Sequence, residues 1–167
     1  MARCPFANWM PVTSRPLEPF RSGPDGLILH ITNSRGNTLQ GIWSTFMVDN
    51  PFPSHFAVDR DGGIAQFLDT QHHDWAEENT TSYFSVENSA NPGDRLSGAQ
   101  IDSVARIYGW LINTHHIALK MAVQAGDTGL AYHSLFPPTN HAMCPGPEVI
   151  GQRHKIIEAT KFSYLPI

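Results

Sequence analysis

Three residues of types that bind zinc stand apart in the sequence. His30 lies inside the apolar run LILHI, His133 lies at the end of the short segment AYH, and Cys144 lies in the turn MCPGP. Catalytic zinc sites use three protein ligands, often imidazole nitrogen or thiolate sulfur, and leave a fourth position for water. Two histidines and one cysteine would complete such a set, and the chemistry would be metal-assisted hydrolysis.

The same three residues also have an ordinary structural interpretation. A single histidine in an apolar strand is usually a buried residue with hydrogen-bonded ring nitrogens, and a cysteine before proline is usually a small buried hydrophobe. The chain contains neither HExxH nor CxxC. Residue types and spacing therefore leave both interpretations open. Apart from His30, His133 and His141, the histidines can be explained as packing, helix-end or surface residues. They are His55, His72, His73, His115, His116 and His154.

Apolar patterning predicts the elements that must position these side chains. Short apolar runs typical of strands cover 27–31, 83–87 and the region around 131–133, and a hairpin with the turn DRDGG lies within 54–67. Apolar residues at helical spacing indicate helices over 38–48 and 98–115. Pro147 followed by Glu148 is typical of a helix start and predicts a further helix over 147–161. Ser97 and Gln100 form a capping box at the start of the second helix.

Because strands alternate with helices, we expect a single α/β (α+β) domain. A length of 167 residues suits one domain with one core. Residues 1–26 contain five prolines and predict an irregular arm packed on the core, followed by the main body over 27–167.

Composition excludes several classes of protein. The formal net charge is −4 and the chain has no basic run, which argues against nucleic acid as a partner. Two cysteines cannot build a disulfide scaffold. No stretch approaches the ~20 apolar residues that membrane insertion requires. The first twenty residues lack the apolar segment of a Sec signal, so we expect synthesis in the cytoplasm without a signal peptide.

Five segments, in order, resemble the zinc-dependent N-acetylmuramoyl-L-alanine amidases of the type 2 amidase and peptidoglycan recognition protein family. They are LILHITNS, SHFAVDRDGGIAQFLD, YFSVENSAN, GAQIDSVARIYGWL, and YHS followed by CPGP. The segments MARCPFANWMPV and IYGWLINTHHI resemble the amidase domains of phage endolysins in particular. The resemblance implies a central mixed β-sheet flanked by helices.

The resemblance also implies roles for individual residues. It identifies His30, His133 and Cys144 as ligands of Zn2+, and Glu87 in FSVE as the catalytic glutamate. The family commonly has a lysine two places before the third ligand. This chain has Ala142 there, so the neighbouring His141 is the candidate for the electrophilic role.

Two further residues are expected to contact substrate, because Asn33 and Trp43 fall in the family's cleft region. The segment HDWAEEN resembles the family's tryptophan-containing substrate strand, with Ala76 where a histidine is usual.

The function implied is hydrolysis of the amide bond between N-acetylmuramic acid and L-alanine in peptidoglycan. We expect a monomer that acts on the cell wall as a phage endolysin, released through holin pores or another route outside Sec. The alternatives are a non-catalytic muropeptide-binding module of the same fold, an injected interbacterial toxin, a recycling amidase, and a cysteine peptidase that pairs Cys144 with His133.

Overall fold

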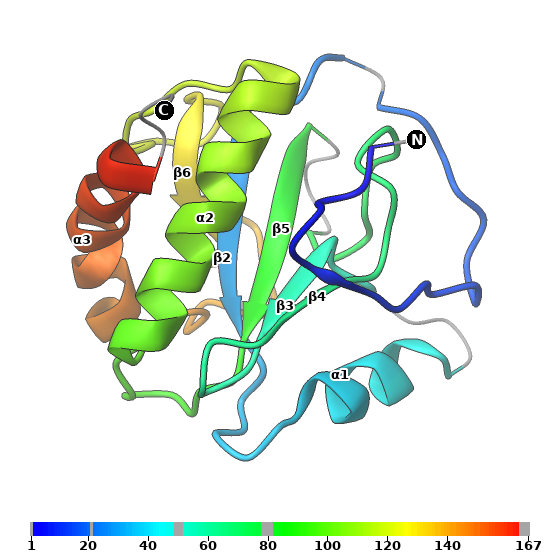
Figure 1. Ribbon diagram of the computed structural model, residues 1–167. Coiled ribbons are helices and arrows are strands. Elements are labelled where there is room, and N and C mark those ends of the chain that lie inside the picture. Colours follow the sequence, from blue (N-terminus) through cyan, green and yellow to red (C-terminus); the bar gives the residue numbers. More distant parts are fainter. Residues whose placement is uncertain (1, 21, 49–51, 78–81, 164–167) are drawn as a thin grey trace.

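The computed structural model describes residues 2–20, 22–48, 52–77 and 82–163, and it contains one mixed β-sheet with helices packed against it (Figure 1). The strand order is β1-β4-β3-β5-β2-β6. The strands are β1 (Asn8–Trp9), β2 (Gly26–Ile31), β3 (Phe56–Val58), β4 (Ile64–Gln66), β5 (Tyr83–Asn88) and β6 (Gly129–Tyr132). The helices are α1 (Leu39–Phe46), α2 (Gly98–His115), α3 (Pro147–Ser163) and the short 3-10 helix η1 (His133–Leu135). The expected α/β class with a mixed sheet is confirmed.

The two faces of the sheet bury different clusters, because successive strand side chains point to opposite sides. On β2, Leu27, Leu29 and Ile31 join the main core, which also contains buried residues of α2 and α3. In Figure 1, α2 crosses in front of the sheet and α3 lies beside it. Ile28 packs in a separate cluster, so His30, two residues further, faces away from α2 and α3.

Local sequence accounts for the long helix α2. The Ser97 hydroxyl accepts a hydrogen bond from the Gln100 backbone, and the Gln100 side chain accepts one from the Ser97 backbone, so the expected capping box is confirmed. Val104, Tyr108 and Leu111 recur at helical spacing and are fully buried. The expected helices over 38–48 and 147–161 are also present, and none of the described helices is long and apolar enough to cross a membrane.

The neighbouring strands β5, β2 and β6 run parallel, so their carboxyl ends meet at one end of the sheet. His30 of β2 pairs in register with Glu87 of β5, which places both side chains on the same face. His133 directly follows β6 as the first residue of η1, where the sequence indicated a strand end. Ligands of open α/β sheets bind outside the carboxyl ends of the strands, and these side chains lie there.

The N-terminal segment differs from the wholly irregular arm that its prolines predicted. Asn8 and Trp9 form β1, which pairs parallel with β4 at the edge of the sheet. Cys4 and Val12 are buried, and Phe20 packs against the main core. A strand of two residues is too short for a periodicity signal, so sequence patterning could not reveal it.

At the start of β2 and β6 the backbone packs too closely for a side chain, so a substitution there tests the fold. A Cβ atom on Gly129 would lie 2.2 Å from the Lys120 carbonyl oxygen, and φ of Gly129 is +117°. We expect Gly129→Ala to lower the free energy of unfolding by more than the roughly 1–3 kcal/mol that backbone strain alone costs. Denaturant unfolding would measure this.

Gly126→Ala is the matched control, because φ there is +88° but nothing lies within 4 Å of the added Cβ atom. It should show the strain cost without the clash. Equal losses of stability in the two variants would contradict the close approach at Gly129.

Candidate metal centre

The structure brings His30, His133 and Cys144 together at the carboxyl edge of the sheet. One potential ligand atom from each residue lies within 4.8 Å of the other two. The imidazole rings of His30 and His133 are 4.5 Å apart between centroids, and Nδ1 of His30 lies 3.9 Å from Sγ of Cys144. Two imidazoles and one thiol converging on one point form a donor set that suits zinc and leaves a coordination position open.

The chemical state of these residues favours cation binding. Burial and the neighbouring His133 ring lower the pKa of His30 well below its usual range, so its ring is neutral and has a free lone pair. Burial and the carboxyl groups of Glu87 and Glu77 raise the pKa of the Cys144 thiol to about 12, although the Ile31 backbone N–H donates a hydrogen bond to the sulfur. A bound cation would replace the thiol proton.

The raised pKa of Cys144 also bears on the cysteine peptidase alternative. The thiolate is the nucleophile in such enzymes, and their cysteines have lowered pKa values. Without a cation, Cys144 is a protonated thiol at neutral pH. The environment of this residue therefore suits a metal ligand better than a nucleophile.

Glu87 lies beside the three-residue centre, as its pairing with His30 requires. Its Oε2 atom is buried and has no hydrogen-bond partner in the part of the chain that the structure describes. Burial and the Asp74 carboxylate raise the pKa of Glu87 to about 8. A carboxyl group with a pKa near neutrality exchanges readily between its two protonation states: the carboxylate accepts a proton from water, and the acid returns it to a leaving group.

A buried network behind His30 was not predicted from the sequence. Glu77 Oε1 lies 2.5 Å from Nε2 of His30, and both side chains are almost fully buried. Burial and the nearby Asp74 carboxyl raise the pKa of Glu77 well above its usual range. Burial also tends to raise the pKa of Asp74. The charge of His55 and hydrogen bonds from His55, Glu77 and Ser85 outweigh this effect, so the Asp74 pKa is lowered.

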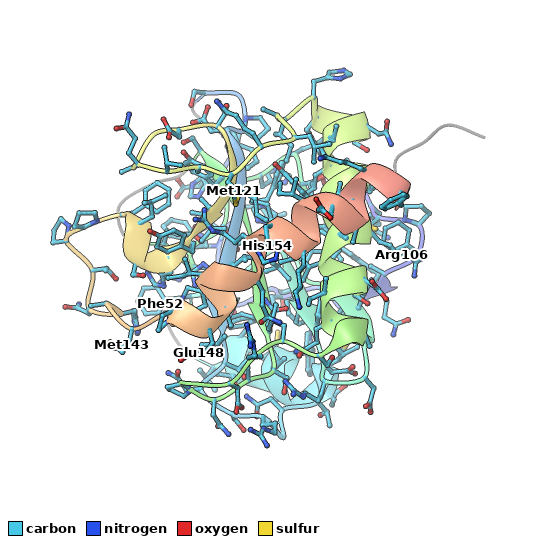
Figure 2. All side chains as sticks on the ribbon, turned by 90° about the vertical axis from the view of Figure 1, so that its left-hand side faces the viewer. Phe52, Arg106, Met121, Met143, Glu148 and His154 are labelled. Carbon is cyan, nitrogen blue, oxygen red and sulfur yellow. The ribbon has the colours of Figure 1, made fainter. Side chains whose placement is uncertain are left out.

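A cleft of about 440 Å³ opens over this centre, within the usual range for small-molecule sites. Its lining includes the three potential ligands, Glu87, Asn33 and His141. His141 is exposed, and its ring centroid lies 5.2 Å from that of His133. Figure 2 shows Met143 of the same loop on the outside of the molecule, next to the start of α3. The predicted residues Asn33 and His141 therefore do reach the cleft.

The structure does not bring Trp43 to this cleft. Ile42, Thr45 and Phe46 of α1 belong to its described lining, whereas the Trp43 indole N–H donates a hydrogen bond to the Pro11 carbonyl. Trp43 lies about 100° around the helix from Ile42 and packs with the cluster that contains Val12. The orientation of α1 thus turns this side chain towards the N-terminal arm.

Comparisons with known proteins agree with this architecture. A model of the N-acetylmuramoyl-L-alanine amidase family matches residues 20–147, a range that includes the three potential ligands and Glu87. A search of curated protein sequences found no significant match. The mixed sheet with helices packed against it and the cleft at its carboxyl edge place the chain in the α/β class. The chain belongs to the N-acetylmuramoyl-L-alanine amidase family, and this membership supports amidase activity on peptidoglycan.

Solved structures share the fold at low sequence identity. The endolysin amidase LysCS from Clostridium intestinale URNW has a TM-score of 0.70 and 18% identity, with 96% of this chain and 97% of that chain covered. A selenomethionine derivative of AmpD has a TM-score of 0.72 and 16% identity, with 93% and 96% covered. The Staphylococcus aureus hydrolase AmiA, in complex with its ligand, has a TM-score of 0.75 and 16% identity, with 98% and 85% covered.

Proposed function

We propose that this protein hydrolyses the amide bond between N-acetylmuramic acid and L-alanine in peptidoglycan, with one zinc ion held by His30, His133 and Cys144. The observation that carries the proposal is the convergence of these three ligand atoms within 4.8 Å in a cleft that also contains Glu87. Family membership supplies the substrate class.

The chain's own residues divide the work of the reaction. The chemistry that zinc supplies in such sites is a lower pKa for water and polarisation of the scissile carbonyl group. Glu87 takes a proton from the attacking water and then delivers one to the leaving amine of L-alanine. Asn33 contacts substrate from the cleft wall, and His141 donates a hydrogen bond to the oxygen that becomes negative during attack.

Two measurements on the purified protein test this proposal. Metal analysis should find about one zinc per chain, and chelation should remove activity that added zinc restores. Digested cell walls should release new N-terminal L-alanine. New reducing sugar ends would identify a glycosidase, an active metal-free protein would contradict the zinc mechanism, and muropeptide binding without any product would indicate a binding module.

A separate prediction concerns His141. Because this side chain is exposed, we expect His141→Ala to reduce turnover by less than the roughly 100- to 1000-fold loss that follows removal of a preorganised oxyanion donor. Zinc affinity should stay unchanged because the three ligands remain. The control is His154→Ala on the exposed side of α3 (Figure 2), which should keep full turnover; equal turnover in both variants would remove His141 from the mechanism.

We also propose that the biological role is cell-wall lysis of the phage endolysin type. The support is the shared fold with LysCS, which is an endolysin amidase. Purified protein added to isolated cell walls should clear their turbidity. Activity restricted to soluble muropeptides would favour a recycling enzyme instead.

A further inference from the structure

The His30 ring presents its two nitrogens to two different groups. Nδ1 lies 3.9 Å from Sγ of Cys144, inside the candidate metal centre. Nε2 lies 2.5 Å from Oε1 of Glu77, on the opposite side of the ring. The His30 and Glu77 side chains are only 3% and 1% exposed, so water does not compete for this contact. The ring therefore lies between the metal centre and a buried carboxyl group.

We propose that Glu77 is a positioning residue, whose carboxyl group accepts the Nε2 hydrogen of His30 and thereby directs the Nδ1 lone pair at the metal centre. The inference rests on the proposed function, since it takes His30 as a zinc ligand. A neutral imidazole carries its hydrogen on one nitrogen only, and the acceptor at the other nitrogen decides which one. Such outer partners hold the ring orientation and raise the basicity of the ligand.

Glu77 can act in this way because further buried bonds hold its segment. Residues 72–77 form neither a helix nor a named strand. Asp74 shares the buried pocket with Glu77, and its Oδ2 atom lies 2.7 Å from Nδ1 of His55. The Ser85 hydroxyl donates to the same Asp74 oxygen, and Nε2 of His55 donates to the His72 carbonyl at 2.8 Å. The loop that carries Glu77 is thus anchored to Ser85 of β5 and to His55, which directly precedes β3.

Zinc affinity, measured by competition with a chelator in the full chain, is the first test. Glu77→Met keeps the length of the side chain and removes the acceptor, so zinc affinity should fall by about 10- to 100-fold. Glu77→Gln keeps a side-chain oxygen at Oε1 and should recover part of this loss. Asp69→Asn is the control, since Asp69 is also buried but accepts hydrogen bonds from the Ala2 and Gln71 backbone; its zinc affinity should match that of the parent.

A second readout needs neither zinc nor a variant. Nitrogen-15 NMR of the histidine rings in the metal-free parent should show His30 with its hydrogen on Nε2, protected from exchange with water. A dominant Nδ1–H form would overturn the inference even if Glu77→Met did not fold. In a folded Glu77→Met protein, the two tautomers should mix.

The outcomes separate this inference from the proposed function. If the parent binds zinc and Glu77→Met binds it within twofold of the parent, Glu77 has no positioning role and the proposed function stands. If the parent binds no zinc at all, both the inference about Glu77 and the proposed function are wrong. Weaker zinc binding in Glu77→Met, with partial rescue in Glu77→Gln, supports the inference.

Discussion

Replacing Cys144 by serine is expected to weaken zinc binding by more than about 100-fold and to remove nearly all amide hydrolysis. Loss of a partner that only orients a ligand already costs about 10- to 100-fold in affinity, and here a direct ligand would be lost. A serine hydroxyl stays protonated at neutral pH and is a poor substitute for a thiolate. Chelator competition and release of N-terminal L-alanine would measure the two effects.

Cys4 provides the matched control for that experiment. It is the second free cysteine and is buried in the main core, where its backbone N–H donates to the Gln66 side chain. Cys4→Ser should therefore keep zinc and activity, whatever it costs in stability. Full zinc and full activity in Cys144→Ser would show that the ligand is misassigned, and full zinc without activity would favour a thiol nucleophile.

Glu87→Gln is expected to lower turnover by about 100- to 10,000-fold, the usual contribution of a general acid–base group. Glutamine has the same shape as glutamate, but its amide cannot take a proton from water at neutral pH. Zinc affinity should change little, because Glu87 is outside the set of three converging ligand atoms. The turnover number at saturating zinc, together with metal content, would separate the two effects.

The control for this variant is Glu148→Gln, at the start of α3 and outside the described cleft lining (Figure 2). It should leave turnover unchanged. If Glu87→Gln kept more than half of the parent turnover, another group in the cleft would have to serve as the base.

Much of the fold could be predicted because its elements carry local patterns. The α2 boundaries follow from the capping box at Ser97 and from apolar residues at helical spacing. The hairpin of β3 and β4 follows from its turn and its two short apolar runs. The strand β1 carries no such pattern, because two residues gain their structure only by pairing with β4.

The sequence predicted His30 and His133 as site residues because each is a possible zinc ligand that lies in or at the end of a predicted strand. Glu77 was not predicted, because its segment has no helical or strand pattern, and its partner His30 lies 47 positions earlier in the chain. The helix that contains Trp43 was predicted, but the direction of the Trp43 side chain depends on its hydrogen bond to Pro11 and on packing against the cluster that contains Val12.

By itself, the sequence determined the three long helices and the strands other than β1, since periodicity and capping act between residues a few positions apart. It also supplied the donor set of His30, His133 and Cys144. Only the tertiary structure decided that these donors converge. The parallel pairing of β2 with β6 brings His30 and His133 to the same end of the sheet, and the loop after η1 returns Cys144 to His30, 114 positions away. The burial that results also raises the pKa of Glu77 and keeps water away from the contact between Glu77 and His30.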